Sequence, residues 1–232
     1  MRDLYKYSAA DRNAVYQAIF QRRDIRHFTS HPVAKDVLQR IAQAAHAAPS
    51  VGFMQPWRII QVKKAQTRQR LHDLVEAERL RTADALEAHA KEFMRLKVQG
   101  ILECSDVWVV CLMDQRERHV FGRRTLPHMD LASASCAIQN IWLAARAEGV
   151  GMGWVSIFEP DELANLLNLP EGAEPIAILC IGHVEAFDDK PLLEREGWAQ
   201  RGDINDYMMQ DAWDEDKNQR AQAQWNRREK AE

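Results

Sequence analysis

Three arginines and one aspartate lie within the five residues Arg22, Arg23, Asp24, Ile25 and Arg26. Guanidinium groups are planar, stay charged at any working pH and donate paired hydrogen bonds to phosphate. A carboxylate among them can act as a general acid or base. Its protonation state depends on two opposing effects, since burial raises its pKa and the arginines lower it. The segment indicates a site for a phosphorylated ligand beside a proton-transfer group. The alternative is a solvated helix end with surface ion pairs, each worth under about 1 kcal/mol.

A second segment, residues 48–57, reads APSVGFMQPW. Its Pro-Ser-Val-Gly stretch can bring the backbone close to a flat ligand, and Ser50 and Gln55 offer hydrogen bonds beside Pro49. The apolar Phe53 either closes a pocket or packs as an ordinary hydrophobic side chain. This segment is expected on a loop, where ligand contacts are common.

Other residue types that could do chemistry give weaker signals. Ser156 follows the stretch Gly-Met-Gly-Trp-Val and has no nearby histidine in sequence, so a hydrogen-bonding role is favoured over that of a triad nucleophile. Arg201 is one arginine among many. The eight histidines and four cysteines show no metal-ligand spacing, and we expect no metal. The cysteines are expected to be buried small hydrophobes.

The elements that would position these residues follow from the hydrophobic pattern. A helix capped by Asp11 is predicted to run to Arg23, with Val15, Ile19 and Phe20 on one face. A second helix over residues 37–48 ends at Pro49, and residues 57–62 form a strand. The loop 49–56 therefore joins a helix to a sheet.

Further along, residues 67–98 predict two surface helices, and residues 105–113 a buried strand. A polar loop covers residues 116–127. A long central helix presents one apolar stripe and ends at Gly149; we expect the stripe to hold Leu131, Ala134, Ser135, Ile138, Trp142 and Ala145. Residues 151–158 and 175–184 are predicted strands, separated by a short helix that opens at Pro160. Alternating strands and helices predict a layered α/β or α+β domain.

Composition bounds the class of protein. The 232 residues are 46% hydrophobic and carry a net charge of −3, with a pI near 6.3, so we expect one sizeable domain and no nucleic acid or membrane partner. The N-terminus lacks an apolar leader, which predicts a soluble, cytoplasmic protein. The domain is expected to span residues 1–213. Residues 214–232 read as a charged tail, either a frayed helix or disordered.

The arginine-rich turn, the Ala-Pro-Ser loop and Gln-Pro-Trp before a strand together resemble the nitroreductase superfamily of FMN-binding proteins. The residues Met129, Gln139, Asn140, Gly149, Trp154 and Ser156 narrow this to its BluB branch, the 5,6-dimethylbenzimidazole synthases. The resemblance runs from about residue 16 to residue 213. It implies an α+β nitroreductase-like fold, with a central, mostly antiparallel sheet flanked by helices. It also implies a homodimer with two flavin sites, each lined by both chains.

For that branch the resemblance implies an unusual reaction, in which reduced FMN is the substrate. O2 attacks it to form a flavin peroxide, and the flavin breaks down to 5,6-dimethylbenzimidazole, the lower ligand of vitamin B12, and erythrose 4-phosphate. NAD(P)H would act only through a separate flavin reductase. The implied catalytic residues are Asp24 and Ser156. The implied phosphate ligands are Arg22, Arg26 and Arg201, and the ring is positioned by Arg23, Ser50 and Gln55, with Ile25 and Pro49 also in contact with the flavin.

Two positions depart from the general superfamily pattern. Asp24 stands where a serine or similar small residue is usual, as it does in the BluB branch. Phe53 stands where many nitroreductases place an asparagine that binds the flavin; an apolar residue would restrict nicotinamide while admitting O2 and excluding water.

Three functions remain open from the sequence. The first is the flavin-consuming synthase, and the second is an NAD(P)H-dependent nitro- or quinone reductase that recycles FMN. The third is a non-catalytic flavin-binding protein. The chain has neither a G-x-G-x-x-G turn after a strand nor a P-loop, so a dinucleotide held on a Rossmann turn is not supported.

Overall fold

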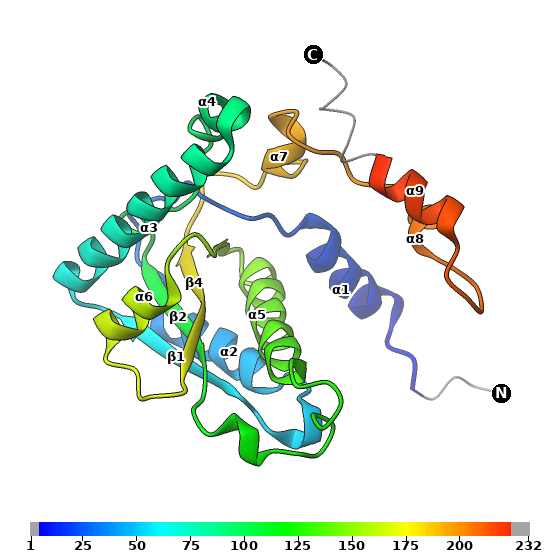
Figure 1. Cartoon of the computed structure of the whole chain (residues 1–232), viewed down its shortest axis with the longest axis horizontal. Helices are drawn as coiled ribbons and strands as arrows, with labels where there is room; N and C mark the ends of the chain where they lie inside the picture. The colour runs from blue at the N-terminus through cyan, green and yellow to red at the C-terminus, as the bar shows by residue number, and fades with distance from the viewer. Residues whose placement is uncertain (1–4, 224–232) are drawn as a thin grey trace. The chain divides into compact units, whose positions relative to one another are not determined.

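The computed structural model describes residues 5–223, which form two compact units, residues 5–187 and 188–223. The first unit contains the sheet and the helices that cover it (Figure 1). Its strands are β1 (Trp57–Val62), β2 (Asp106–Leu112), β3 (Gly151–Val155) and β4 (Glu174–Gly182). Among the described residues they pair in the order β1-β2-β4-β3, and every neighbouring pair is antiparallel.

Helices of the first unit lie on both faces of this sheet. They are α1 (Ala9–Gln21), α2 (Lys35–His46), α3 (Ala65–Ala85), α4 (Ala90–Phe93), α5 (Met129–Ala147) and α6 (Pro160–Leu167). Short 3-10 turns occur at Val51–Phe53, Glu87–His89 and Arg116–Arg118.

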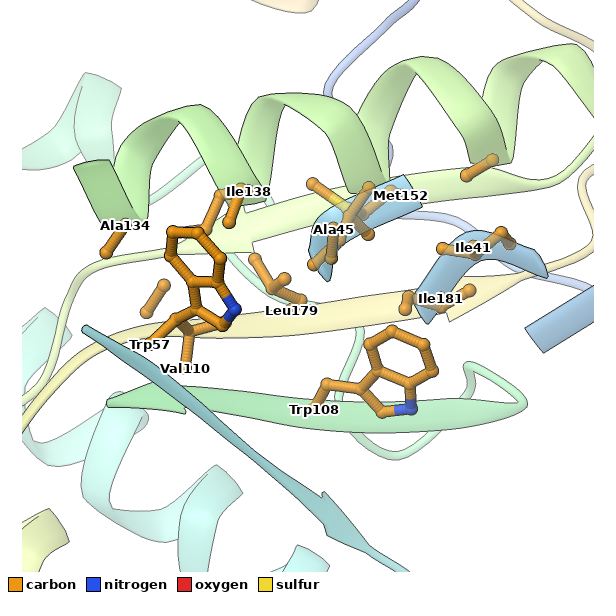
Figure 2. Close-up of a cluster of buried hydrophobic side chains, with 14 of the residues drawn as sticks. Ile41, Ala45, Trp57, Trp108, Val110, Ala134, Ile138, Met152, Leu179 and Ile181 are labelled. Carbon is orange, nitrogen blue, oxygen red and sulfur yellow. The ribbon is translucent and has the colours of Figure 1, made fainter. Parts of the chain in front are cut away.

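The core has two layers because alternate residues of a strand point to opposite faces. Trp108 and Val110 of β2 face α2 and α5, in the layer shown in Figure 2, whereas Val107 and Val109 face α3 and α6. Both β2 and β4 are buried on both sides, which explains their continuous apolar runs. The predicted antiparallel sheet flanked by helices and all four strand positions are confirmed.

The end of α5 and the start of α6 agree with the sequence predictions. Gly149 follows α5 with a positive φ of 72°, the left-handed conformation that glycine adopts freely and that was predicted at this position. Pro160 opens α6 as predicted. The predicted pair of helices over 67–98 is one long helix, α3, followed by the single turn of α4.

Three sequence predictions were wrong in detail. Ser8, not Asp11, caps α1: its hydroxyl accepts a hydrogen bond from the Asp11 backbone N–H at 3.1 Å, because serine accepts at that distance from a first-turn amide as well as aspartate does. The buried face of α5 is rotated from the predicted stripe, since Leu131 is exposed and Ile141 is buried. Cys136, on the outer side of α5, is exposed, although the other three cysteines are buried and all four are free thiols.

The second unit contains α7 (Leu192–Arg195), α8 (Ile204–Tyr207) and α9 (Glu215–Ala223). Arg220 of α9 pairs with Asp206 of α8 at 2.7 Å. The start of the predicted charged tail is therefore helical, and the rest of it lies outside the described residues. A single domain over residues 1–213 stays a prediction.

Candidate functional site

The arginine-rich segment is docked on the edge of the sheet. The Ile25 backbone N–H donates to the Met152 carbonyl at 3.0 Å, and Asp24 forms a parallel bridge with Met152 of β3. A Cβ atom on Gly153 would overlap the Ile25 carbonyl oxygen and the Arg26 guanidinium. Glycine at position 153 is therefore what lets this segment lie so close to β3.

Asp24 is held by three hydrogen bonds. Arg26 donates to its two carboxylate oxygens, Nη1 to Oδ1 at 2.7 Å and Nη2 to Oδ2 at 2.6 Å, and the Trp154 backbone N–H donates to Oδ1 at 2.9 Å. The side chain nevertheless stays 44% exposed. The surrounding protein raises the pKa of Asp24 above 3.8, because removing water from the carboxylate outweighs the opposing effects of Arg26 and the Trp154 N–H.

Arg26 joins this carboxylate to the strand. Its Nη2 also donates to the Trp154 carbonyl at 2.8 Å, and its side chain is only 11% exposed. Trp154 thus contacts both members of the pair through its backbone. Ser156, exposed, is the first residue after β3 and lies two positions beyond Trp154. The structure therefore brings Asp24, Arg26 and Ser156 to one end of β3.

The other two arginines are fixed on α5. The Arg22 guanidinium lies 4.6 Å from the ring centroid of Trp142, and the Trp142 indole N–H donates to the Arg23 carbonyl at 3.0 Å. Arg23 Nη1 donates to the Phe20 carbonyl at 2.8 Å, at the end of α1. Three guanidinium groups and the ionised Asp24 give this segment a local charge of about +2 (3 − 1), which matches a phosphate monoester at neutral pH.

Loop 49–55 has an unusual backbone. Gly52, Phe53 and Gln55 all have positive φ angles, of 52°, 54° and 49°. Left-handed conformations at non-glycine residues are strained and are found preferentially at functional sites. The Ser50 hydroxyl accepts from the Gln55 N–H at 3.0 Å, which closes the loop on itself.

The two apolar residues Phe53 and Met54 of this loop differ in burial. Met54 is buried, as ordinary packing predicts, but the Phe53 side chain is 83% exposed, so it is not packed in the core of its own chain. Pro49 is exposed, and Ser50 and Gln55 are half-buried.

Helix α5 positions both candidate segments. The Ser133 hydroxyl accepts from the Val51 N–H at 3.0 Å, and nine residues later Trp142 binds the Arg23 carbonyl. Nine residues of helix span about 13 Å. Within one chain the two segments are therefore attached to different stretches of the same helix. Arg201 is exposed and belongs to the second unit, so its predicted contact with the phosphate stays a prediction.

Sequence reasoning missed three residues of β3 and α5 that support the candidate site: Gly153, Ser133 and Trp142. A glycine inside a strand marks a close backbone approach, and the Gly-Met-Gly spacing in β3 was a usable signal for the first of them. Ser133 and Trp142 carried no such signal, because their partners are backbone groups far away in the chain. No cluster of metal-ligating side chains occurs within residues 5–223, and no helix described there could cross a membrane.

The fold defines the class of protein. Nitroreductase A from Vibrio parahaemolyticus matches 92% of this chain and 84% of its own at a TM-score of 0.67 and 20% identity. An NADPH:FMN oxidoreductase from Vibrio harveyi, solved in complex with NAD+, matches 91% of this chain and 84% of its own at 0.67 and 19% identity. At these identities the likeness establishes the α+β nitroreductase fold.

The sequence comparisons give the family. The nitroreductase family model matches residues 19–183, and the chain belongs to the nitroreductase family. A 5,6-dimethylbenzimidazole synthase from Rhodobacter capsulatus is 36% identical over 196 residues, 84% of this chain and 95% of the relative. One from Rhodospirillum rubrum is 36% identical over 187 residues, 79% of this chain and 89% of the relative.

Proposed function

We propose that this protein is a 5,6-dimethylbenzimidazole synthase, which converts reduced FMN and O2 into 5,6-dimethylbenzimidazole and erythrose 4-phosphate. Three relatives that carry this name are 33–36% identical over most of the chain. The observation that carries the proposal is Asp24, a carboxylate with a raised pKa that Arg26 and Trp154 fix at the end of β3, the strand that Ser156 directly follows.

The residues present fit a phosphorylated flavin. The local charge of about +2 suits the FMN phosphate, and we assign Arg22, Arg26 and Arg201 to it. Since Arg26 already binds Asp24, it would connect the phosphate side of the site to the carboxylate. Ring positioning falls to Arg23, Ile25, Pro49, Ser50 and Gln55. Reduced flavin supplies both the electrons that O2 accepts and the aromatic carbons of the product.

Asp24 is the proton-transfer group in this proposal. Fragmentation of a flavin requires protons to be removed from carbon, and a fixed carboxylate whose side chain stays 44% exposed can accept them. Its raised pKa makes it a stronger base than an aspartate in water, and the bidentate contact with Arg26 fixes its direction. Ser156 offers a hydroxyl that can donate to a developing oxyanion beside it.

We further propose that two copies of the chain form the working enzyme, with each flavin site lined by both. The ring of Tyr16 stacks on that of Phe20 at 6.0 Å, and both are exposed along α1. Phe53 and Phe121 are likewise exposed, at 83% and 84%. Exposed aromatic clusters of this kind mark interaction surfaces. A second copy would also allow the two segments held apart on α5 to meet across a symmetric interface.

The decisive experiment mixes the purified protein with excess chemically reduced FMN, admits air, and follows the small molecules by chromatography and mass. We expect a dimethylbenzimidazole peak that matches the loss of flavin. Intact oxidised FMN with hydrogen peroxide would contradict the proposal. In that case rapid bleaching of bound FMN by NAD(P)H alone would identify a reductase, and no turnover would identify a flavin carrier.

The same assay tests the source of electrons. We propose that reduced FMN comes from a separate flavin reductase and that NAD(P)H has no direct site on this chain. Adding NADH together with an unrelated flavin reductase should then support product formation, whereas NADH alone should not.

A further inference from the structure

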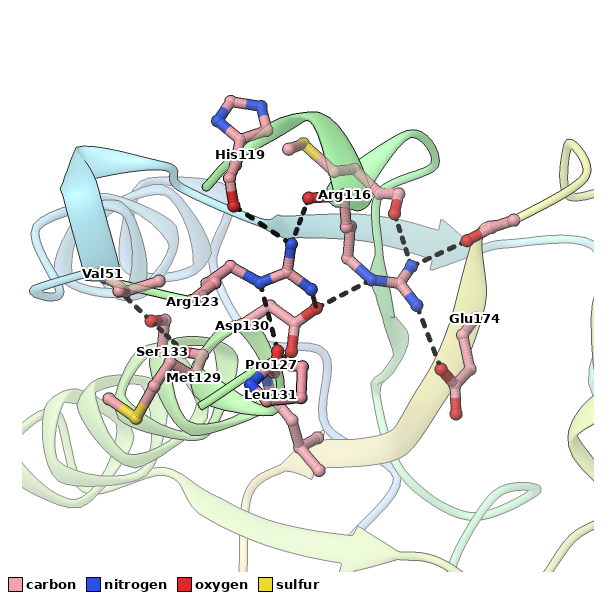
Figure 3. A network of polar contacts seen from close by, with 12 residues as sticks. Val51, Arg116, His119, Arg123, Pro127, Met129, Asp130, Leu131, Ser133 and Glu174 are labelled. Atoms are coloured by element: carbon pink, nitrogen blue, oxygen red, sulfur yellow. Dashed lines mark hydrogen bonds and ion pairs between the residues drawn. The ribbon is translucent and has the colours of Figure 1, made fainter. Parts of the chain in front are cut away.

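A buried ion network lies away from Asp24, at the start of α5. Asp130, 8% exposed, accepts hydrogen bonds at Oδ2 from Arg116 Nε at 3.0 Å and from Arg123 Nη2 at 2.9 Å. Its Oδ1 accepts from the Leu131 backbone N–H at 2.7 Å. Figure 3 shows the two guanidinium groups meeting on this one carboxylate. The polar loop predicted over residues 116–127 is therefore anchored by its arginines.

Both arginines also bind backbone carbonyls. Arg116 donates to the Gly172 carbonyl at 2.7 Å and pairs with Glu174 at the start of β4. Arg123 donates to the carbonyls of Arg116, His119 and Pro127, the last at 3.1 Å. Each arginine therefore connects several backbone carbonyls to the one buried carboxylate of Asp130. These contacts fix the path of residues 119–124, which we call the covering segment.

The covering segment lies directly on loop 49–55. A Cβ atom on Gly52 would stand 3.0 Å from the Phe121 carbonyl, and one on Gly122 would stand 2.5 Å from Val51 Cγ2. Gly122 itself has a φ of 76°. The Val51 N–H is bound on its other side by Ser133, one turn after Asp130 on α5. Val51 therefore lies between the covering segment and α5, directly before the left-handed residues Gly52 and Phe53.

We propose that Asp130 is a positioning residue for loop 49–55. By holding Arg116 and Arg123 it keeps the covering segment pressed on Val51 and Gly52, which maintains the strained backbone at Phe53 and Gln55 before any ligand binds. Strained conformations persist only where the surroundings over-determine them, and here the surroundings are this network. The inference uses the proposed function only in taking loop 49–55 as the surface that contacts the flavin.

The first test needs no flavin. In Asp130→Asn the isosteric side chain cannot neutralise the two guanidinium groups, so the covering segment should loosen. We expect amide hydrogen exchange at Val51 and Gln55 to accelerate about tenfold, a typical effect of weakening local structure. Unchanged exchange at these two amides in a folded Asp130→Asn protein would overturn the proposal.

A control uses a half-buried ion pair elsewhere in the fold. Glu76 of α3 pairs with Arg79 at 3.1 Å and accepts from Gln99 Nε2 at 3.2 Å, on the opposite face of the sheet. Glu76→Gln should leave exchange at Val51 and Gln55 unaltered. Equal acceleration in both variants would show that Asp130 only supports general stability, and would also overturn the proposal.

A second variant keeps the test valid if Asp130→Asn folds poorly. Gly122→Ala places a methyl group against Val51 and disturbs the same contact without removing a charge. It should accelerate exchange at the same two amides. The double variant should be little worse than the more affected single variant, because both act through one contact, whereas Glu76→Gln and Gly122→Ala should combine additively.

The last readout links positioning to the ligand. With oxidised FMN as the probe, fluorescence titration of Asp130→Asn should give a Kd about five- to tenfold above that of the unsubstituted protein, the range expected for coupled neighbours. In turnover, KM for reduced FMN should rise while kcat and its pH profile stay constant. If the unsubstituted protein binds no FMN, the proposed function fails, and the exchange result still decides the role of Asp130.

Discussion

Asp24 and Asp130 are both carboxylates bound by arginine, yet their surroundings differ. Asp130 is 8% exposed, receives two guanidinium groups and spends its remaining oxygen on the Leu131 N–H. Asp24 receives one guanidinium group and one backbone N–H and is 44% exposed. The first carboxylate is enclosed by its own chain, and the second still has room for a ligand.

If Asp24 is the proton-transfer group that we propose, an ion pair alone does not distinguish a structural carboxylate from a reactive one. What distinguishes them is the oxygen surface that remains available and the element to which each is attached. Asp130 connects a loop, a helix and a strand, so its substitution should loosen the covering segment and loop 49–55. Asp24 connects to one strand end, so its loss should act on chemistry alone.

The largest expected effect is the loss of chemistry in Asp24→Asn. Dimethylbenzimidazole formation from reduced FMN should fall at least about 100-fold, the usual contribution of a general base, while oxidised FMN still binds within a few-fold of the unsubstituted affinity. Product analysis and fluorescence titration measure the two quantities. An undiminished yield would remove Asp24 from the mechanism and erase the contrast with Asp130.

Gly153→Ala should damage the same site through the backbone. The new methyl group would overlap the Ile25 carbonyl, so the arginine-rich segment must move off β3, at a cost of roughly 1–3 kcal/mol in unfolding free energy and with weaker FMN binding. Gly149→Ala is the control: no atom lies within 4 Å of its added Cβ, and only its positive φ penalises it. Denaturant titration should show a loss of unfolding free energy in both variants, and fluorescence titration should show FMN affinity lost in the first alone.

The pH dependence of turnover should reveal the raised pKa of Asp24. The base is active when ionised, so the rate should fall as pH drops through the pKa, with a midpoint above 3.8. The contribution of Asp24 to folding stability depends on pH in the opposite direction. Because the folded state holds the proton more tightly than the unfolded chain, the contribution of Asp24 to stability declines as pH rises from 3.8 through the raised pKa. Unfolding of Asp24→Asn should lack this component, and an acid limb centred below 3.8 would contradict the assignment.

The smallest effect concerns the hydroxyl that anchors loop 49–55. Ser133→Ala leaves the Val51 N–H without its acceptor and should cost about 1 kcal/mol in unfolding free energy. Ser135→Ala is matched in helix and chemistry, but its exposed hydroxyl donates only to the Leu131 carbonyl, and the change should stay within about 0.5 kcal/mol. Equal losses in thermal or denaturant unfolding would mean that Ser133 does not anchor the loop.

Local patterns were sufficient for much of the fold, and they singled out most residues of the candidate site. The run at Val107–Leu112 and the glycine at 149 predicted a buried strand and a helix end because each depends on neighbours in sequence. The face of α5 was misjudged, since which side is buried depends on where α2 and the sheet lie. Asp24 was singled out as a candidate because three arginines lie beside it in the sequence. Its hydrogen bond with Trp154 could not be predicted, because that contact joins residues 130 positions apart.

The parallel bridge between Asp24 and Met152 has a consequence for assembly of the chain. It covers the outer edge of β3, which would otherwise expose unpaired backbone groups to other chains. It also joins residues 128 positions apart, and such contacts form late because a long loop must close first. If the flavin binds at this edge, as we propose, a nascent or partly unfolded chain would still lack its binding site.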